Sequence, residues 1–318
     1  MSRPAPRFHN FIGHRTTVDF LRRQLAGALA RHEPFPHVLF LGRSGIGKTL
    51  LARSLATEFG TKVVDAMGCL SRRDLAHKLG KLALGDFLLV DEAHQLDPLT
   101  QELLTEAIDE HSIPNLEPER KSKERVERRI NIPPWTLALA TDQPGKLLDA
   151  LQRRIVIRVE LRLYRITELK EIVEVLAANQ NLLVSAQGAR LLAEVSGGLP
   201  RCARFHLQNL RLFFPDSEQR QLGIPEIREF LAASGVDESG LGNLERTYLE
   251  ELSRRGNASL ESMSLVLGTD PAYLRRWTEA SLVDKGLVDI ASRGRSLTPK
   301  ESRQNKLPNY LLMRGWIS

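Results

Sequence analysis

The sequence predicts an α/β fold class for the first half of the chain, followed by a small all-helical domain and a winged helix. Between Val38 and Leu161, short β-rich apolar runs alternate with segments of helical period, which is typical of a parallel sheet with helices on both faces. After Leu161 the strand signals stop and three helical segments follow. Beyond a glycine- and serine-rich linker, three more helical segments precede a short hairpin-like segment, which is the order of a winged helix.

These changes in pattern divide the chain into four expected parts. They are a sheet domain at 1–161, a small helical domain at 162–236, a winged-helix domain at 237–305 and a C-terminal extension at 306–318. The extension contains apolar residues that could cover a surface of the protein or bind a partner.

The composition is that of a globular protein with an excess of positive charge. With 318 residues, 42% of them hydrophobic, the chain can bury the cores of two or three domains. Its formal net charge of +6 favours a polyanionic partner such as nucleic acid. Cys69 and Cys202 lack the spacing of metal ligands, so we expect buried thiols in a reducing cytoplasm. Since no apolar run reaches the roughly 18 residues of a membrane helix and no signal-peptide core is present, we expect a cytoplasmic protein without membrane contact.

The first strand-to-helix connection carries a phosphate-binding motif. The stretch GRSGIGKT fits G-x-x-x-x-G-K-[ST], after a predicted strand and before a predicted helix. Glycines let backbone amides approach phosphate oxygens, Lys48 would reach the β- and γ-phosphates, and the Thr49 hydroxyl would bind Mg²⁺. A turn that merely needs glycines would explain neither Lys48 nor Thr49. We therefore expect ATP to contact Gly42, Gly45, Ile46, Gly47, Lys48, Thr49 and Leu50.

Two adjacent carboxylates, Asp91 and Glu92, end the predicted strand DFLLV. Carboxylates at the end of a buried strand repel one another, so they need a cation or water nearby. Beside a nucleotide, Asp91 would hold Mg²⁺ and Glu92 would polarise the attacking water. Taken alone, such a pair is more typical of a helix N-cap region, but the upstream phosphate-binding motif favours the catalytic interpretation.

The segment TLALATDQPGKLLDALQRR provides further candidates near the γ-phosphate. Its predicted strand ends in Thr141 and Asp142, which could place a polar side chain beside the phosphate. Arg153 and Arg154 follow at a helix end, where arginines also complement the helix dipole. An arginine that serves the ATP of a neighbouring subunit would explain their position better.

The co-linear order of these motifs resembles that of an AAA+ ATPase, and roughly residues 3–299 are similar to the RuvB family of bacterial Holliday-junction branch-migration motors. The similarity is carried by RPAPRFHNFIGH, HVLFLGRSGIGKT, GDFLLVDEAHQL, PPWTLALATDQPGKLLDALQRR, ELRLYRITELKEIV, SGGLPRCARFHLQNLR and SRGRSLTP. The resemblance implies an AAA+ P-loop ATPase domain, a helical lid domain, a DNA-binding winged helix, and ATP and Mg²⁺ as cofactors.

The resemblance also implies roles for residues outside the P-loop. Phe11, Ile12, Tyr164 and Pro200 would line the adenine pocket. Arg201, in the stretch GGLPR, matches the sensor-2 arginine that links the helical lid to the nucleotide.

Two further positions concern hydrolysis. Arg154 occupies the place of the finger arginine in the family's LRDRF pattern, and Arg153 replaces an acidic residue there. Asp142 stands where the family usually has a threonine as its first sensor, so either Thr141 takes that role or the switch is altered. An unpaired carboxylate near the γ-phosphate would repel it.

The partner surfaces implied by the resemblance lie at a hairpin and at the wing. The family places a β-hairpin that docks on the junction-binding protein RuvA where this chain has the charged segment 117–130, which a solvated loop would also explain. In the winged helix, Arg293 and Arg295 match DNA-contacting arginines, which would bind phosphates without reading the base sequence. A solvated basic tail is the alternative there.

Together these features predict an ATPase that drives Holliday-junction branch migration on four-way or duplex DNA. We expect a homo-hexamer that works with a RuvA-like partner. The alternative function is a RuvB-derived switch that uses ATP to assemble on DNA and recruits a partner without translocating. A clamp-loader-like protein is a third interpretation, which the winged helix disfavours.

Overall fold

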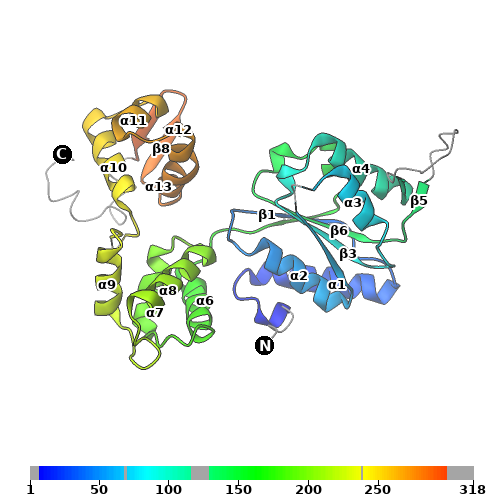
Figure 1. Cartoon of the computed structure of the whole chain (residues 1–318), viewed down its shortest axis with the longest axis horizontal. Helices are drawn as coiled ribbons and strands as arrows, with labels where there is room; N and C mark the ends of the chain where they lie inside the picture. Colours follow the sequence, from blue (N-terminus) through cyan, green and yellow to red (C-terminus); the bar gives the residue numbers. More distant parts are fainter. Residues whose placement is uncertain (1–6, 68–69, 116–128, 238, 299–318) are drawn as a thin grey trace. The chain divides into compact units, whose positions relative to one another are not determined.

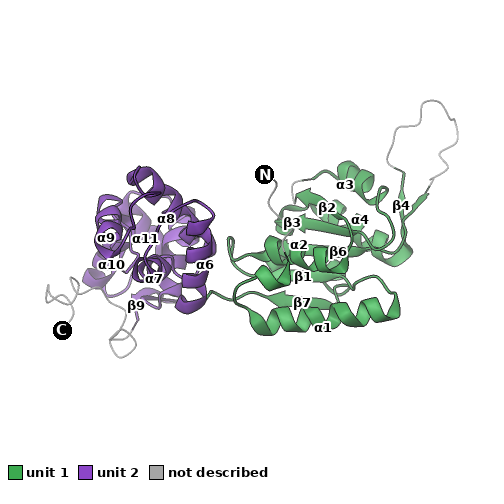
Figure 2. Ribbon diagram, turned by 90° about the horizontal axis from the view of Figure 1, so that it is seen from below, with its two compact units in different colours: residues 1–164 green, residues 165–318 purple. Residues whose placement is uncertain are grey.

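The computed structural model of the chain describes residues 7–67, 70–115, 129–237 and 239–298 (Figure 1). The chain divides into two compact units, 1–164 and 165–318 (Figure 2). Within the described ranges, no helix combines the length and the apolar character that crossing a bilayer requires. The boundary expected between residues 236 and 237, inside the second unit, stays a prediction.

The first unit alternates strands and helices along the chain. Its elements are η1 (Phe8–Asn10), α1 (Arg15–Arg31), β1 (Val38–Leu41), α2 (Lys48–Phe59), β2 (Val63–Met67), α3 (Arg72–Leu79), β3 (Phe87–Asp91), η2 (Ala93–Gln95), α4 (Pro98–Glu110), β4 (Ser112–Pro114), β5 (Arg129–Asn131), β6 (Thr136–Thr141), η3 (Pro144–Lys146), α5 (Asp149–Gln152) and β7 (Ile157–Glu160).

A parallel sheet in the order β2-β3-β6-β1-β7 forms the centre of the first unit. Val38 of β1 pairs with Ala138 of β6 on one side and with Ile157 of β7 on the other. All of β6 is buried because α1 and α2 cover one face of the sheet and α3 and α4 cover the other (Figure 1). The predicted α/β class is confirmed. Because β3, β6 and β1 are neighbours, their carboxyl ends bring three connecting loops to one edge of the sheet.

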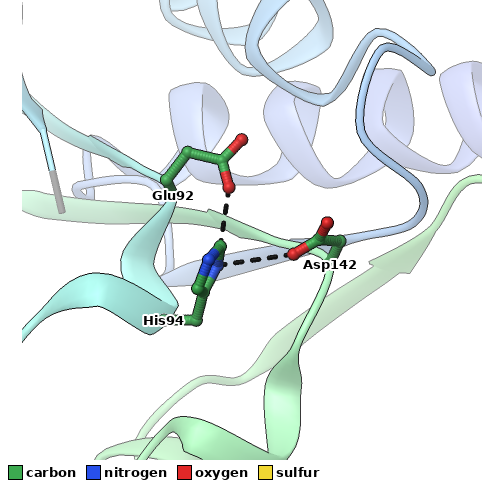
Figure 3. Close-up of side chains that lie close together, drawn as sticks. All are labelled: Glu92, His94 and Asp142. Carbon is green, nitrogen blue, oxygen red and sulfur yellow. Dashed lines mark ion pairs between the residues drawn. The ribbon is translucent and has the colours of Figure 1, made fainter. Parts of the chain in front are cut away.

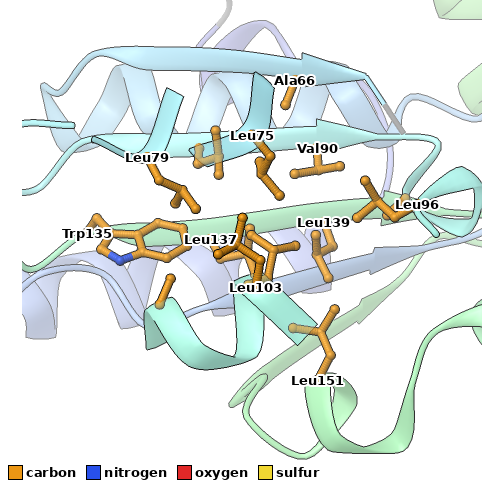
Figure 4. Close-up of a cluster of buried hydrophobic side chains, with 14 of the residues drawn as sticks. Ala66, Leu75, Leu79, Val90, Leu96, Leu103, Trp135, Leu137, Leu139 and Leu151 are labelled. Atoms are coloured by element: carbon orange, nitrogen blue, oxygen red, sulfur yellow. The ribbon is translucent and has the colours of Figure 1, made fainter. Parts of the chain in front are cut away.

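Alternation along the strands builds the core between the sheet and α3 and α4. Successive side chains of a strand point to opposite faces, so every second residue of β3 and β6 meets these helices. Figure 4 shows this cluster, in which α3, α4 and α5 pack against the strands. Its buried members include Leu75, Leu79, Val90, Leu103, Trp135, Leu137, Leu139 and Leu151.

The hairpin expected near residue 120 is described only at its base. There, β4 and β5 pair antiparallel, with Ile113 opposite Ile130. Arg129 forms ion pairs with Glu106 at 2.6 Å and Glu110 at 2.7 Å, which tie β5 to the end of α4. Most of the charged segment 117–130 lies outside the described residues.

The second unit is helical up to its final hairpin. Its elements are α6 (Ile166–Ala178), α7 (Ala186–Val195), α8 (Pro200–Phe213), α9 (Ile224–Ala233), α10 (Asn243–Arg255), α11 (Leu260–Leu267), α12 (Pro271–Tyr273), the π-helical segment η4 (Leu274–Glu279), α13 (Ala280–Asp284), β8 (Val288–Ala291) and β9 (Gly294–Leu297).

Two features of the stretch before the winged helix depart from the sequence-based expectation. The structure adds α9 to the three expected helices before the linker, and Glu226 stabilises its start by accepting a hydrogen bond from the backbone N of Gly223 at 2.8 Å. Cys202 is half-buried rather than buried, and Cys69 lies outside the described residues.

The winged-helix prediction is confirmed. Helices α10 and α11 precede the continuous run α12–η4–α13, and β8 and β9 form the antiparallel wing. Tyr248, Leu252, Leu274 and Leu282 are fully buried in the core of this module. The backbone of Arg295 exchanges hydrogen bonds with Ala258, which fixes the wing to the segment between α10 and α11.

Candidate nucleotide-binding site

The loop between β1 and α2 has a backbone that only glycine adopts without strain. Gly42 has a φ of +140°, and a Cβ atom there would lie 2.6 Å from the carbonyl oxygen of Leu161. Gly47 has a φ of +110°, and a Cβ atom there would lie 3.7 Å from both the Phe11 ring and the Tyr164 hydroxyl, which is ordinary contact, so the backbone conformation is what requires glycine. The glycines of the motif therefore serve two needs, a left-handed backbone and a close approach to neighbouring groups.

Lys48 begins α2 and folds back over this loop. Its side chain is buried, and Nζ donates to the carbonyl oxygens of Gly42 at 2.8 Å and Arg43 at 3.1 Å. The ammonium group is thus held inside the turn whose amides and helix N-terminus suit phosphate oxygens. This arrangement fits the predicted phosphate-binding role.

Thr49 and Asp91 come together from α2 and the end of β3. The Thr49 hydroxyl donates to Oδ2 of Asp91 at 2.7 Å, and the backbone N of Glu92 donates to Oδ1 at 3.0 Å. A hydroxyl and a carboxylate side by side are oxygen ligands of the kind that Mg²⁺ prefers. The residues present therefore fit a magnesium site next to the phosphate loop.

Glu92 lies just beyond β3 in an unusual backbone conformation. Its φ of 52° and ψ of 44° are left-handed, which is uncommon for a residue with a side chain. Such strained positions concentrate at functional sites. The conformation turns the chain sharply between Asp91 and η2.

A contact that the sequence analysis missed joins Glu92 to Asp142 through His94 (Figure 3). Nδ1 of His94 lies 3.4 Å from Oδ1 of Asp142 and 3.5 Å from Oε2 of Glu92. It also lies 3.2 Å from Oγ1 of Thr141. The signal available in the sequence was the position of His94, two residues after Glu92 in the stretch DEAH.

The predicted adenine-pocket residues of the first unit gather next to the P-loop. The rings of Phe11 and His14 lie 6.4 Å apart, and His14 meets Tyr164 edge to face at 4.6 Å. His14 is a second residue that the sequence analysis missed. Ile12 is half-buried beside Phe11.

The remaining lid residues belong to the second unit. Pro200 is the first residue of α8 and Arg201 is exposed in the first turn of that helix. They share neither a unit nor an element with the P-loop.

Arg154 is held within its own chain. Its guanidinium donates to both carboxylate oxygens of Asp109, through Nε at 2.7 Å and through Nη2, and Nη1 donates to the carbonyl oxygen of Ala150 at 2.6 Å. The hydrogen bonds between the two side chains lower the pKa of Asp109 and raise that of Arg154. Arg153 is exposed.

The two wing arginines differ in their surroundings. Arg293 is exposed at the tip of the hairpin, whereas the side chain of Arg295 is only 14% exposed. Nε of Arg295 donates to Glu279 at 2.8 Å, and the same carboxylate accepts from the Tyr248 hydroxyl at 2.8 Å. Burial and the hydrogen bond to Glu279 raise the pKa of Tyr248, and the hydrogen bond to Glu279 raises that of Arg295.

The domain comparisons identify the family. A family model described as "Holliday junction DNA helicase RuvB P-loop domain" matches residues 3–161. The chain belongs to the RuvB family. A second model, "RuvB C-terminal winged helix domain", matches residues 238–303.

RuvB relatives match nearly the whole chain. The "Holliday junction branch migration complex subunit RuvB" of Staphylococcus aureus (strain JH9) is 30% identical over 298 residues, which are 92% of this chain and 89% of the relative. The structure titled a RuvB Holliday junction branch migration motor from Thermotoga maritima is 28% identical, with a TM-score of 0.78 over 95% of this chain and 98% of that one. NtrX from Brucella abortus in complex with ATP is similar in fold. It is 16% identical, with a TM-score of 0.55 over 86% of this chain and 69% of that one.

Membership of the RuvB family confirms the resemblance drawn from the motifs. It makes the first unit a nucleotide-binding P-loop ATPase domain and the C-terminal module a RuvB winged helix.

Proposed function

We propose that this protein is an ATP-driven motor of Holliday-junction branch migration. The observation that carries the proposal is that one chain combines an ordered P-loop site with a winged helix. A RuvB relative matches this chain over 92% of its length. A switch that assembles on DNA without translocating is not favoured, because the relatives that match so much of the chain are named as branch-migration subunits.

The geometry supports a division of labour among the site residues. Lys48 binds the β- and γ-phosphates at the start of α2, and Thr49 and Asp91 hold Mg²⁺, which would neutralise phosphate charge when bound. Glu92 orients and polarises the attacking water from its place next to Asp91. The ring of Phe11 lies near those of His14 and Tyr164, and these rings form an aromatic wall for the adenine.

The other predicted roles depend on assembly and on the second unit. We infer that Arg154 acts on the ATP of the next subunit of a homo-hexamer, which requires it to exchange Asp109 for a phosphate. Pro200 contributes to the adenine pocket and Arg201 links α8 to the nucleotide. Asp142 acts as the sensor, through the contact described above.

DNA is the substrate of the proposed motor, and phosphate contacts dominate its binding. Arg293 and Arg295 position duplex arms through phosphates without reading bases; Arg293 is exposed on the wing, and Arg295 also pairs with Glu279. The hairpin that begins at β4 is the surface for a RuvA-like junction-binding partner in the cytoplasm. Binding that relies on phosphates weakens steeply between about 50 and 200 mM salt.

A synthetic four-way junction with homologous arms tests the proposal. We expect the junction to stimulate ATP turnover and, with a RuvA-type protein present, to be converted to duplex products. Lys48→Ala is the matched control and should do neither. ATP hydrolysis without conversion of the junction, with the RuvA-type protein present, would favour the switch and contradict the motor.

A further inference from the structure

His94 lies at the point where the β3 and β6 ends meet. It belongs to η2, which begins directly after Glu92. Its side chain is 7% exposed. Figure 3 shows its ring between the side chains of Glu92 and Asp142, which come from different loops. The three residues therefore connect the water-polarising position to the sensor position inside one ATP site.

The chemistry of the groups around Nδ1 selects a donor there. Ionised carboxylates only accept hydrogen bonds, so Glu92 and Asp142 can interact with His94 only as acceptors, and Oδ1 of Asp142 also accepts from Nε2 of Gln143 at 3.3 Å. The Thr141 hydroxyl, 3.2 Å from Nδ1, already accepts from the backbone N of Gln143 at 3.0 Å. A tautomer with hydrogen on Nδ1 can donate to either carboxylate or to Thr141, whereas a bare Nδ1 could accept from the Thr141 hydroxyl alone and would face the two carboxylates with its lone pair.

One hydrogen on Nδ1 cannot serve both carboxylates well. The distances to Asp142 and Glu92, 3.4 and 3.5 Å, differ little, and both exceed the roughly 2.7–2.9 Å of a strong charge-assisted hydrogen bond. Neither carboxylate therefore forms a strong hydrogen bond with the imidazole of His94. A small movement of either side chain therefore decides which of them His94 holds.

We propose that His94 is a positioning residue through which Asp142 controls the orientation of Glu92. When Asp142 accepts the Nδ1 hydrogen, Glu92 is released to orient water; when Asp142 withdraws, His94 holds Glu92 back. This inference rests on the proposed ATPase function of the site and deepens it. It also gives a partner to the carboxylate that stands in place of the family's threonine.

The arrangement predicts that the effects of Asp142 and His94 on turnover are not additive. Asp142→Asn, which weakens the acceptor without changing its size, should lower kcat about tenfold, within the range for coupled neighbours, and leave the Kd for ATP within about twofold. In a His94→Gln background the same substitution should change kcat by less than about twofold, because glutamine places its amide nitrogen near the Nε2 position and not near Nδ1. His94→Leu should behave as His94→Gln does.

His94→Asn is the matched control, because its amide nitrogen lies near the Nδ1 position and keeps the donor. In that background Asp142→Asn should again lower kcat severalfold. Equal effects of Asp142→Asn in the wild-type, His94→Gln and His94→Leu backgrounds would overturn the role of His94 while leaving the ATPase intact. A wild-type protein that binds ATP without turning it over, with junction DNA present, would overturn the proposed function and this inference with it.

Discussion

Substitutions of Arg295 and Arg293 distinguish the stability of the wing from its binding of DNA. The Glu279 carboxylate is 1% exposed and accepts from Nε of Arg295 at 2.8 Å and from Nη2 at 3.3 Å. In Arg295→Ala the Glu279 carboxylate would keep its hydrogen bond from the Tyr248 hydroxyl but lose the guanidinium that balances its charge. Breaking a buried ion pair on one side costs about 3–5 kcal/mol; because Arg295 lies close to the surface and Tyr248 remains, we expect about 3 kcal/mol.

Hydrogen exchange followed by mass spectrometry measures this loss in the winged helix of the full chain. Since 1.4 kcal/mol is a factor of ten, amides of α10 and η4 that exchange through opening of this module should exchange roughly 100-fold faster in Arg295→Ala. Arg293→Ala, an exposed change on the same hairpin, is the matched control and should alter stability by less than about 0.5 kcal/mol.

Duplex binding provides the second half of the test. Arg293→Ala should weaken DNA binding and reduce the salt slope by about one phosphate contact while the exchange rates stay unchanged. Unchanged exchange in Arg295→Ala would refute the structural role of the ion pair.

Three further predictions concern the ATP site and the sheet. Glu92→Gln should retain ATP binding and lose turnover, whereas Lys48→Ala should lose both; turnover in Glu92→Gln equal to wild type would contradict the assignment. Mixing Arg154→Ala subunits with Lys48→Ala subunits should restore part of the ATPase rate, and no recovery in an assembled mixture would argue against a shared site. Burial lowers the pKa of His37 to about 4, and its Nδ1 accepts from the backbone N of Leu137 at 3.0 Å. Its contribution to stability is therefore complete above about pH 6.5 and declines as the pH falls towards 4, by about 2–3 kcal/mol at pH 4.5. Urea unfolding at pH 7 and 4.5 should show a smaller loss in His37→Gln; an equal loss would exclude His37 as the cause.

Local motifs made the ATP site predictable. The P-loop is read from eight consecutive residues because the glycines, Lys48 and Thr49 act through a short turn whose conformation they determine themselves. The alternation of strands and helices, which predicts a parallel sheet, likewise follows from the hydrophobic period, whereas the order of the strands was not predicted. Asp91 could be proposed as a metal ligand because its strand follows a phosphate-binding motif; without that motif a helix N-cap region would have been the better interpretation.

Contacts between distant segments were not visible in the sequence. The role of His94 depends on its contacts with Thr141 and Asp142. These residues are distant in the sequence and lie next to His94 only because β3 and β6 are neighbours in the sheet. The pairing of Arg295 with Glu279 depends in the same way on how the wing folds back. The π-helical turn at η4 has no sequence signature of its own, so a regular helix was expected there.

On the proposal that Arg154 serves the ATP of a neighbouring subunit, its ion pair with Asp109 has a consequence for the contact between subunits. An isolated subunit carries its arginine already satisfied, so a neighbouring nucleotide must displace an internal carboxylate before it can hold the side chain. A triphosphate brings more negative charge to that competition than a diphosphate does. The proposed role of Arg154 therefore predicts that the guanidinium returns to Asp109 once the terminal phosphate is lost, and that the contact between subunits weakens at that point.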